Sequence, residues 1–139
     1  MNRYPISKLL EVLLVREIVS RLHATKSATP PVTINLVNPG LCKSSLDRST
    51  TKPALTVQIL LFILRSILDR TTEVGARTFV LAACAGPNSH GEFMSDGKNQ
   101  DVESWIYGDV GKRVQKKVFE QTMKVLEMRK PGVGEAVGL

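Results

Sequence analysis

The fold of this chain is decided where it reads Val32-Thr33-Ile34-Asn35-Leu36-Val37-Asn38-Pro39-Gly40. Side chains alternate between the two faces of a strand, so apolar residues interrupted by the polar Thr33 and Asn35 predict a half-buried strand over residues 32–37. The strand is expected to end abruptly at residues 38–40, because asparagine, proline and glycine favour turns and proline cannot donate to a sheet.

A helix is predicted on each side of this strand. Before it, apolar residues recur at helical spacing from about Tyr4 to Leu22, and the polar connector over residues 25–31 ends in two prolines. After it, a polar loop leads to a second helix from about Pro53 to Asp69. This second helix has a stripe of core residues, but its other side is apolar as well.

The rest of the chain is also mixed in character. Residues 71–73 are typical of a helix start, whereas residues 78–84 fit a buried strand and the end of a helix equally well. Residues 91–95 predict a short strand closed by Asp96-Gly97, and a last helix is expected over about 110–128. Two or three strands are few for a sheet covered by helices, so this α/β chain resembles part of a larger unit.

Length and composition limit the function further. The chain has 139 residues, of which 42% are hydrophobic and 23% charged, and this length and composition suit one folded domain. Its net charge is +6. The densest basic group, at residues 112–117, lacks the interleaved aromatic residues of a nucleic-acid site and is expected to be a solvated helix face. There is no apolar stretch of the roughly 20 residues that span a membrane, and we expect no secretory leader, because no basic start followed by an apolar core opens the sequence. Two cysteines alone make no metal site. We therefore expect a cytoplasmic protein without a nucleic-acid partner, a membrane span or a metal.

One pair of residues can carry chemistry. Tyr4 and Lys8 are four positions apart, which places them on one face of a helix, one turn apart. A nearby positive charge favours a phenolate, so such a tyrosine can donate a proton to a carbonyl or accept one from an alcohol. The spacing alone is a weak signal and favours a solvated helix start, and both alternatives stay open at this point.

The order of these features resembles the C-terminal part of the short-chain dehydrogenases/reductases. In that family Tyr-x-x-x-Lys is the catalytic signature, and a Pro-Gly follows the next strand beside the nicotinamide. Residues 37–44 are similar to the family's Pro-Gly-x-x-x-Thr pattern, with Ser44 in place of threonine. Residues 73–78 and 86–91 look like members found in fungal secondary metabolism. Each motif is weak alone, but their joint occurrence in this order is specific.

The resemblance predicts a domain over residues 1–131 and a flexible tail over 132–139. It implies an α/β fold, namely the C-terminal part of a Rossmann-type doubly wound parallel sheet, with residues 72–84 as a helix and 92–95 as the last strand. The N-terminal, glycine-rich cofactor-binding half of that fold has no counterpart here. Three glycines over residues 132–138 imitate its loop, but no strand precedes them and no helix follows.

The resemblance also assigns roles to individual residues. Tyr4 would be the general acid/base, and Lys8 would favour its phenolate and hydrogen-bond the nicotinamide ribose. Gly40 would let the backbone approach the cofactor, because a side chain there would clash. Cys42 would offer backbone contacts, and Ser44 would touch the nicotinamide amide or a phosphate. The implied cofactor is NADP or NAD, with NADP slightly favoured.

The implied activity is the interconversion of an alcohol and a carbonyl on a small metabolite, in fungal secondary-metabolite biosynthesis. The apolar helix over residues 53–69 falls in the family's variable, substrate-covering region and hints at a lipophilic substrate, although a core helix explains it equally well. Two hypotheses remain: a truncated chain of a longer enzyme, inactive alone, or a non-catalytic remnant that binds no cofactor and docks onto an intact relative through its sheet edge. The first helix also has enough apolar surface to pair in a homo-oligomer, although burial within one chain explains this surface equally well.

Overall fold

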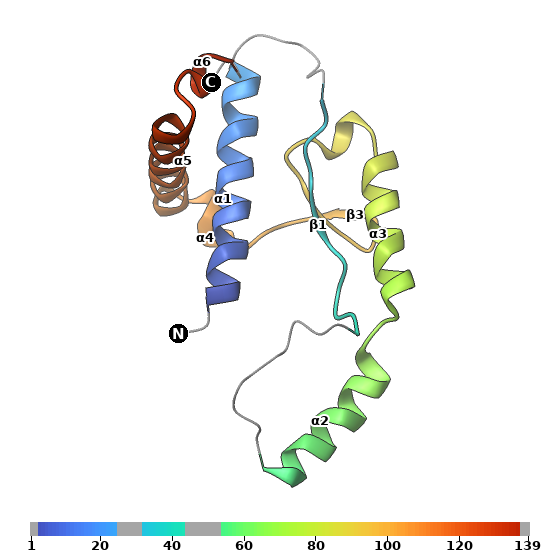
Figure 1. Cartoon of the computed structure of the whole chain (residues 1–139). Helices are drawn as coiled ribbons and strands as arrows, with labels where there is room; N and C mark the ends of the chain where they lie inside the picture. Colours follow the sequence, from blue (N-terminus) through green and yellow to red (C-terminus); the bar gives the residue numbers. More distant parts are fainter. Residues whose placement is uncertain (1–2, 25–31, 44–53, 137–139) are drawn as a thin grey trace.

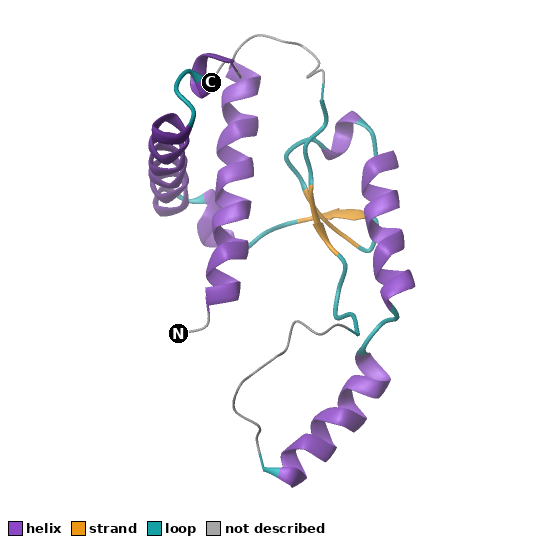
Figure 2. Cartoon of the chain, viewed as in Figure 1, coloured by secondary structure: helices purple, strands orange, loops and turns teal. Residues whose placement is uncertain are grey.

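Helices pack on both sides of a small sheet in the computed structural model of this chain (Figures 1 and 2). Helices α1 (Arg3–Ala24) and α5 (Asp109–Arg129) lie on one side and α3 (Thr72–Cys84) lies on the other, as in a doubly wound fold. Helix α2 (Leu55–Leu68) extends away from these layers (Figure 1). The structure describes residues 3–24, 32–43 and 54–136.

The sheet has three short strands in the order β1-β2-β3. Strand β1 (Leu36–Asn38) pairs in parallel with β2 (Phe93–Ser95), with Val37 opposite Met94. This parallel pair is the expected part of the doubly wound sheet. The antiparallel partner of β2, β3 (Lys98–Gln100), was not predicted, because Lys-Asn-Gln lacks the β-branched and aromatic residues typical of strands.

The first strand begins later than the predicted residue 32. The N–H of Ile34 donates to Nδ1 of His90 at 3.1 Å, and the carbonyl of Ile34 accepts from the N–H of Gly91 at 2.7 Å. The regular ladder starts only at Leu36, whose N–H donates to the carbonyl of Glu92 at 2.9 Å. An imidazole thus replaces a backbone partner at Ile34, which gives His90 a structural role.

The long helices match their predicted positions. α1 and α5 each extend at most two residues beyond the predicted ends. Residues 72–84 are helical, as the family resemblance implied, and Thr71 caps this helix, because its Oγ1 accepts from the N–H of Val74 at 3.2 Å. The short helix α4 (Ser104–Tyr107) leads into α5.

The core is small and is concentrated where α1 meets α4 and α5. Leu13, Ile106 and Phe119 are each at most 4% exposed. A polar contact also joins α1 and α5: Gln115 Nε2 donates to Oε2 of Glu17 at 2.9 Å. On the other side of the sheet the buried residues are few and include Ala82 and Met94.

Helix α2 does not form the core stripe that its sequence predicted, at least within the described residues. Its large apolar side chains with assigned burial are all exposed, and they are Leu55, Val57, Ile59, Leu60, Leu61, Phe62, Ile63, Leu64 and Leu68. The stripe was expected to pack on the chain, but α2 extends away from the layers that could cover it (Figure 1).

The C-terminal segment is partly helical. The N–H groups of Gly132 and Gly134 donate to the Glu127 carboxylate at 2.8 and 2.7 Å, and α6 (Val133–Ala136) forms there. The domain boundary at residue 131 stays a prediction. Among the helices of the described segments, none has both the length and the apolarity needed to cross a membrane.

Candidate functional site

An open cavity of about 810 Å³ lies where α1, α3 and the end of β1 meet. Tyr4 and Lys8 line it from the first turns of α1, and Asn38 and Pro39 line it from the end of β1. The structure therefore brings the two residues of the Tyr-x-x-x-Lys motif to the same cavity as the start of the Pro-Gly turn. These positions are 30 or more residues apart in the sequence, and only the packing of helix against strand joins them.

Lys8 is held by a neighbour that the sequence analysis did not single out. Its Nζ lies 2.9 Å from both carboxylate oxygens of Glu11 and 5.9 Å from the centre of the Tyr4 ring. The hydrogen bond to Glu11 raises the pKa of Lys8 above its ordinary value, so the ammonium stays charged at neutral pH. The spacing of Lys8 and Glu11, three residues on a helix, could have indicated this pair.

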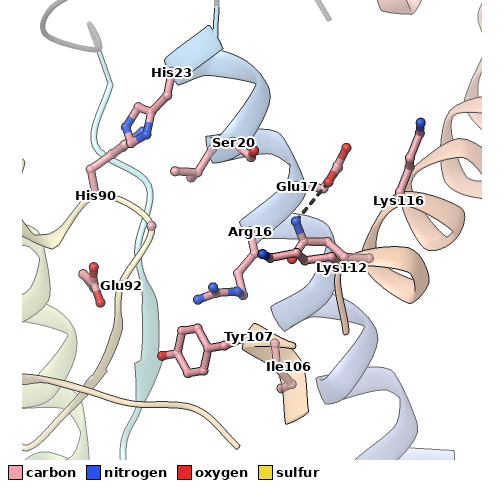
Figure 3. Close-up of a pocket in the computed structure, with 13 residues that line it drawn as sticks. Arg16, Glu17, Ser20, His23, His90, Glu92, Ile106, Tyr107, Lys112 and Lys116 are labelled. Atoms are coloured by element: carbon pink, nitrogen blue, oxygen red, sulfur yellow. Dashed lines mark hydrogen bonds between the residues drawn. The ribbon is translucent and has the colours of Figure 1, made fainter. Parts of the chain in front are cut away.

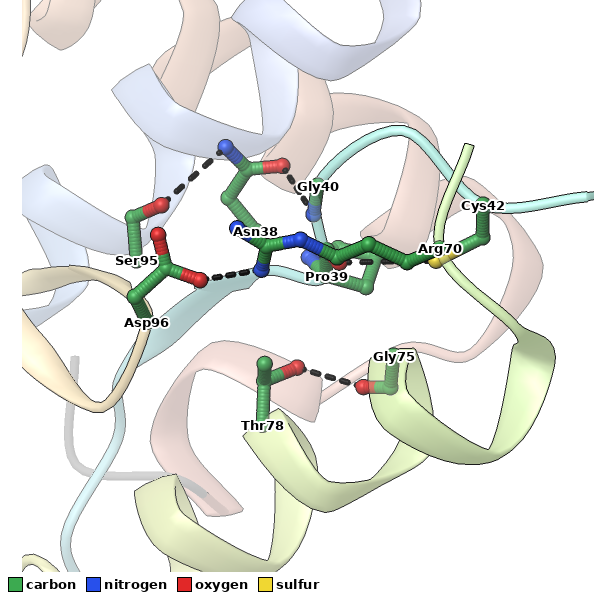
Figure 4. Close-up of polar contacts among 9 residues, drawn as sticks. All are labelled: Asn38, Pro39, Gly40, Cys42, Arg70, Gly75, Thr78, Ser95 and Asp96. Carbon is green, nitrogen blue, oxygen red and sulfur yellow. Dashed lines mark hydrogen bonds and ion pairs between the residues drawn. The ribbon is translucent and has the colours of Figure 1, made fainter. Parts of the chain in front are cut away.

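The Pro-Gly turn is shaped by its own side chains (Figure 4). The Oδ1 of Asn38 accepts from the N–H of Gly40 at 3.1 Å, and Gly40 adopts a φ of 75°, in the left-handed region that favours glycine. The Sγ of Cys42 donates to the carbonyl of Pro39 at 3.4 Å. In the described part of the chain, Gly40 and Cys42 directly follow the cavity lining without lining it themselves, and Ser44 lies outside the described residues.

A second cavity, of about 690 Å³, lies among α1, α5 and the segment before β2 (Figure 3). It brings together the two histidines, His23 at the end of α1 and His90, with ring centres 5.2 Å apart. Burial lowers the pKa of His90, and the nearby His23 lowers it further, so the imidazole is neutral. Nothing in the local sequence around either histidine could have indicated their contact. In the segments that the structure describes, no three histidine, cysteine or acidic residues group as metal ligands.

The donor groups of the first cavity fit one end of a nicotinamide nucleotide. A phenol hydroxyl and an ammonium can donate to ribose hydroxyls, and the phenol can also donate to a carbonyl oxygen. Tyr4 and Lys8 would therefore hold the nicotinamide riboside end. The described segments contain no glycine-rich turn between a strand and a helix that could cradle a pyrophosphate.

Comparison with known proteins adds to this geometry. No family model and no solved structure matches the chain. The chain is 45% identical to the short chain dehydrogenase/reductase dmxR8 of Cryptosporiopsis sp. (strain 8999), 35% to the short-chain dehydrogenase anuD of Penicillium roqueforti (strain FM164), and 32% to the short chain dehydrogenase AOL_s00215g274 of Arthrobotrys oligospora (strain ATCC 24927). These alignments cover 95%, 96% and 94% of the chain.

The same alignments cover 38%, 35% and 38% of the three relatives, so the chain spans little more than a third of their length. The relatives come from fungal secondary-metabolite clusters, which agrees with the resemblance of residues 73–78 and 86–91. Three observations agree on the family: the order of the motifs, the parallel β1–β2 pair flanked by helices, and the curated relatives. The chain therefore belongs to the short-chain dehydrogenases/reductases, of which it represents the C-terminal portion.

Proposed function

We propose that the protein containing this chain is an NAD(P)-dependent oxidoreductase that interconverts an alcohol and a carbonyl. The supporting observation is that Tyr4 and Lys8 line one cavity at the carboxyl end of β1. Ligands of open α/β sheets bind outside the carboxyl ends of the strands, so a proton donor is present where a cofactor and a substrate would meet.

Tyr4 would act as the general acid/base. In the direction of reduction its hydroxyl donates a proton to the carbonyl oxygen, and in the direction of oxidation its oxygen accepts the proton of the alcohol. The ammonium of Lys8, kept charged by Glu11, would stabilise negative charge on the phenol oxygen and donate to the ribose. The nicotinamide, of NADP or NAD, supplies or accepts the hydride when bound. Gly40, Cys42 and Ser44 would contact it through the Pro-Gly turn.

The substrate would be a small, lipophilic metabolite of a fungal secondary pathway. The relatives belong to such pathways. The exposed apolar surface of α2 directly follows residue 53, in the region that varies with substrate in the family, and burial against a lipophilic molecule would remove it from water.

The test is Tyr4→Phe in the intact protein, with NADPH oxidation followed against a panel of ketones and aldehydes. Loss of a general acid should lower turnover by about 10²–10⁴-fold, with circular dichroism unchanged. The matched control is Tyr107→Phe, since Tyr107 hydrogen-bonds Asp101 and lies in the second cavity. Full activity of Tyr4→Phe would refute the role of Tyr4.

The alternative is a remnant that binds no cofactor, which is motivated by the chain's coverage of little more than a third of its relatives. NADPH titration of the 139-residue chain, followed by Trp105 fluorescence, separates the two. A remnant should show no saturable quenching, whereas saturable quenching at micromolar NADPH would exclude it. Mapping the 5′ end of the transcript then identifies the protein to be used in the turnover assay.

A further inference from the structure

We infer that Arg70 is a positioning residue that holds the Pro-Gly loop, residues 39–43, in the place required for cofactor binding. The inference rests on the proposed function for the role of this loop. The loop follows β1, and Arg70 lies in the short link between α2 and α3. Arg70 and the Pro-Gly loop, which are far apart in the sequence, therefore lie next to each other.

The first contact is through the backbone. The N–H of Arg70 donates to the carbonyl of Leu41 at 2.8 Å, and the N–H of Lys43 donates to the carbonyl of Arg70 at 3.0 Å. Arg70 and Cys42 form a parallel bridge, so the loop is paired with this residue as one strand is paired with another. These bonds set the position of the loop along the α2–α3 link.

The second contact is through the guanidinium group (Figure 4). Arg70 forms an ion pair with Asp96, and its Nη1 lies 3.3 Å from the position that a Cβ would take at Gly40. The side chain therefore runs across the surface of Gly40 on its way to Asp96. A larger residue at position 40 would push the guanidinium away from its partner.

Asp96 lies in the turn that connects β2 and β3. Asp96 and Gly97 are the two loop residues, with φ of 54° and 72°, as a type I′ turn requires. The turn thereby places Asp96 next to the Arg70 guanidinium, with which its carboxylate pairs (Figure 4). The hydrogen bond between the two side chains raises the pKa of Arg70 and lowers that of Asp96, so the pair is charged at neutral pH.

The loop is thereby fixed between two supports. Arg70 holds it from one side, and the start of α3 supports it at Gly75, where a Cβ would overlap the Cys42 Sγ. Pro39, at the start of the loop, lines the cavity of Tyr4 and Lys8. Arg70 thus holds the loop against the α2–α3 link and the β2–β3 hairpin, and the first residue of that loop faces the cavity.

The two cysteines provide a readout that does not depend on activity. Cys42 is part of the loop and is half-buried, whereas Cys84 at the end of α3 is exposed. In the intact protein without NADPH, iodoacetamide alkylation of both thiols is followed by mass spectrometry. Arg70→Ala should speed the alkylation of Cys42 several-fold and leave Cys84 unchanged. The control is Arg77→Ala, which removes an exposed arginine that pairs with Glu73 one turn away on the same helix.

Asp96→Asn is the second variant, because asparagine accepts the positive φ of the turn and only the charge is lost. It decides the outcome if Arg70→Ala does not fold. Faster alkylation of Cys42 supports the inference, and unchanged alkylation in Asp96→Asn, or in both variants, overturns it. Arg70→Lys should rescue part of the protection, because it keeps the charge and the backbone bonds but not the planar fork.

NADPH affinity then connects the loop to the cofactor. If the loop of Asp96→Asn is in the binding position a tenth of the time, the Kd for NADPH rises about tenfold, with turnover at saturation little changed. Tyr4→Phe should differ by losing turnover even at saturating NADPH, whatever the loss of its hydrogen bond to the cofactor does to Kd. Fast alkylation with unchanged NADPH affinity would overturn the role of Arg70 in cofactor binding and would leave the role of Tyr4 to its own test.

Discussion

A single methyl group at Gly75 tests the packing beneath the Pro-Gly loop. A Cβ there would lie closer to the Cys42 Sγ than the 3.0 Å below which real Cβ contacts essentially do not occur, and 3.7 Å from the Pro39 Cβ. In Gly75→Ala the sulfur must move to the 3.4–4 Å of ordinary contact, and the loop moves with it. We expect overpacking to cost about 1–3 kcal/mol. The better helix propensity of alanine offsets about 0.5–1 kcal/mol of this.

The sign of the effect should reverse when the sulfur is removed. In a Cys42→Ala background the methyl group meets no sulfur, and Gly75→Ala should stabilise the protein by about 0.5–1 kcal/mol. The coupling between the two positions is then about 1–3 kcal/mol. Urea unfolding of the parent, the two single variants and the double variant, followed by circular dichroism, measures it. A Gly75→Ala effect of equal size in both backgrounds would refute the argument.

Three further predictions follow from burial and charge. Gly111→Ala should destabilise by about 1–3 kcal/mol or more in thermal unfolding, because its Cβ would overlap the backbone of Ile106, which cannot rotate away. Leu13→Ala should cost about 2–5 kcal/mol in urea unfolding, since Leu13 is 1% exposed. The pKa of His90 is lowered in the folded state, so the unfolded chain binds the proton more tightly. Stability should therefore fall as the pH drops below about 6.5, and melting temperatures should show a weaker fall in His90→Gln.

The elements that the sequence predicted well are those with long periodic patterns. α1 and α5 each run for more than 20 residues, so many apolar positions at helical spacing support each predicted helix, and an error of one or two residues at an end matters little. β1 was predicted in the right place, but the predicted strand began too early. The N–H of Ile34 bonds a histidine side chain 56 residues away instead of a strand backbone. β3 was missed, although Asp96-Gly97 is a strong hairpin signal and should have indicated a strand on each side.

The candidate site was predicted only where its geometry is local. Tyr4 and Lys8 share a face because of helical spacing, and Glu11 could have been added by the same rule. Arg70 could not be found in this way, because it lies in a three-residue link between two helices, and its partners come from a distant loop and a distant hairpin. The catalytic role of Tyr4 and the cofactor contacts of Gly40, Cys42 and Ser44 remain predictions.

The left-handed backbone of Asp96 also restricts how this chain can diverge. Glycine, asparagine and aspartate accept that conformation most readily, and of these only aspartate is charged. An exchange of partners, with the acid at position 70 and arginine at 96, would keep the attraction but place a long side chain in a strained turn. In descendants of this chain the pair can be kept or lost, but it cannot be inverted. The residue at position 96 would then indicate whether the hairpin turn is kept, and the residue at position 70 whether the loop is still held.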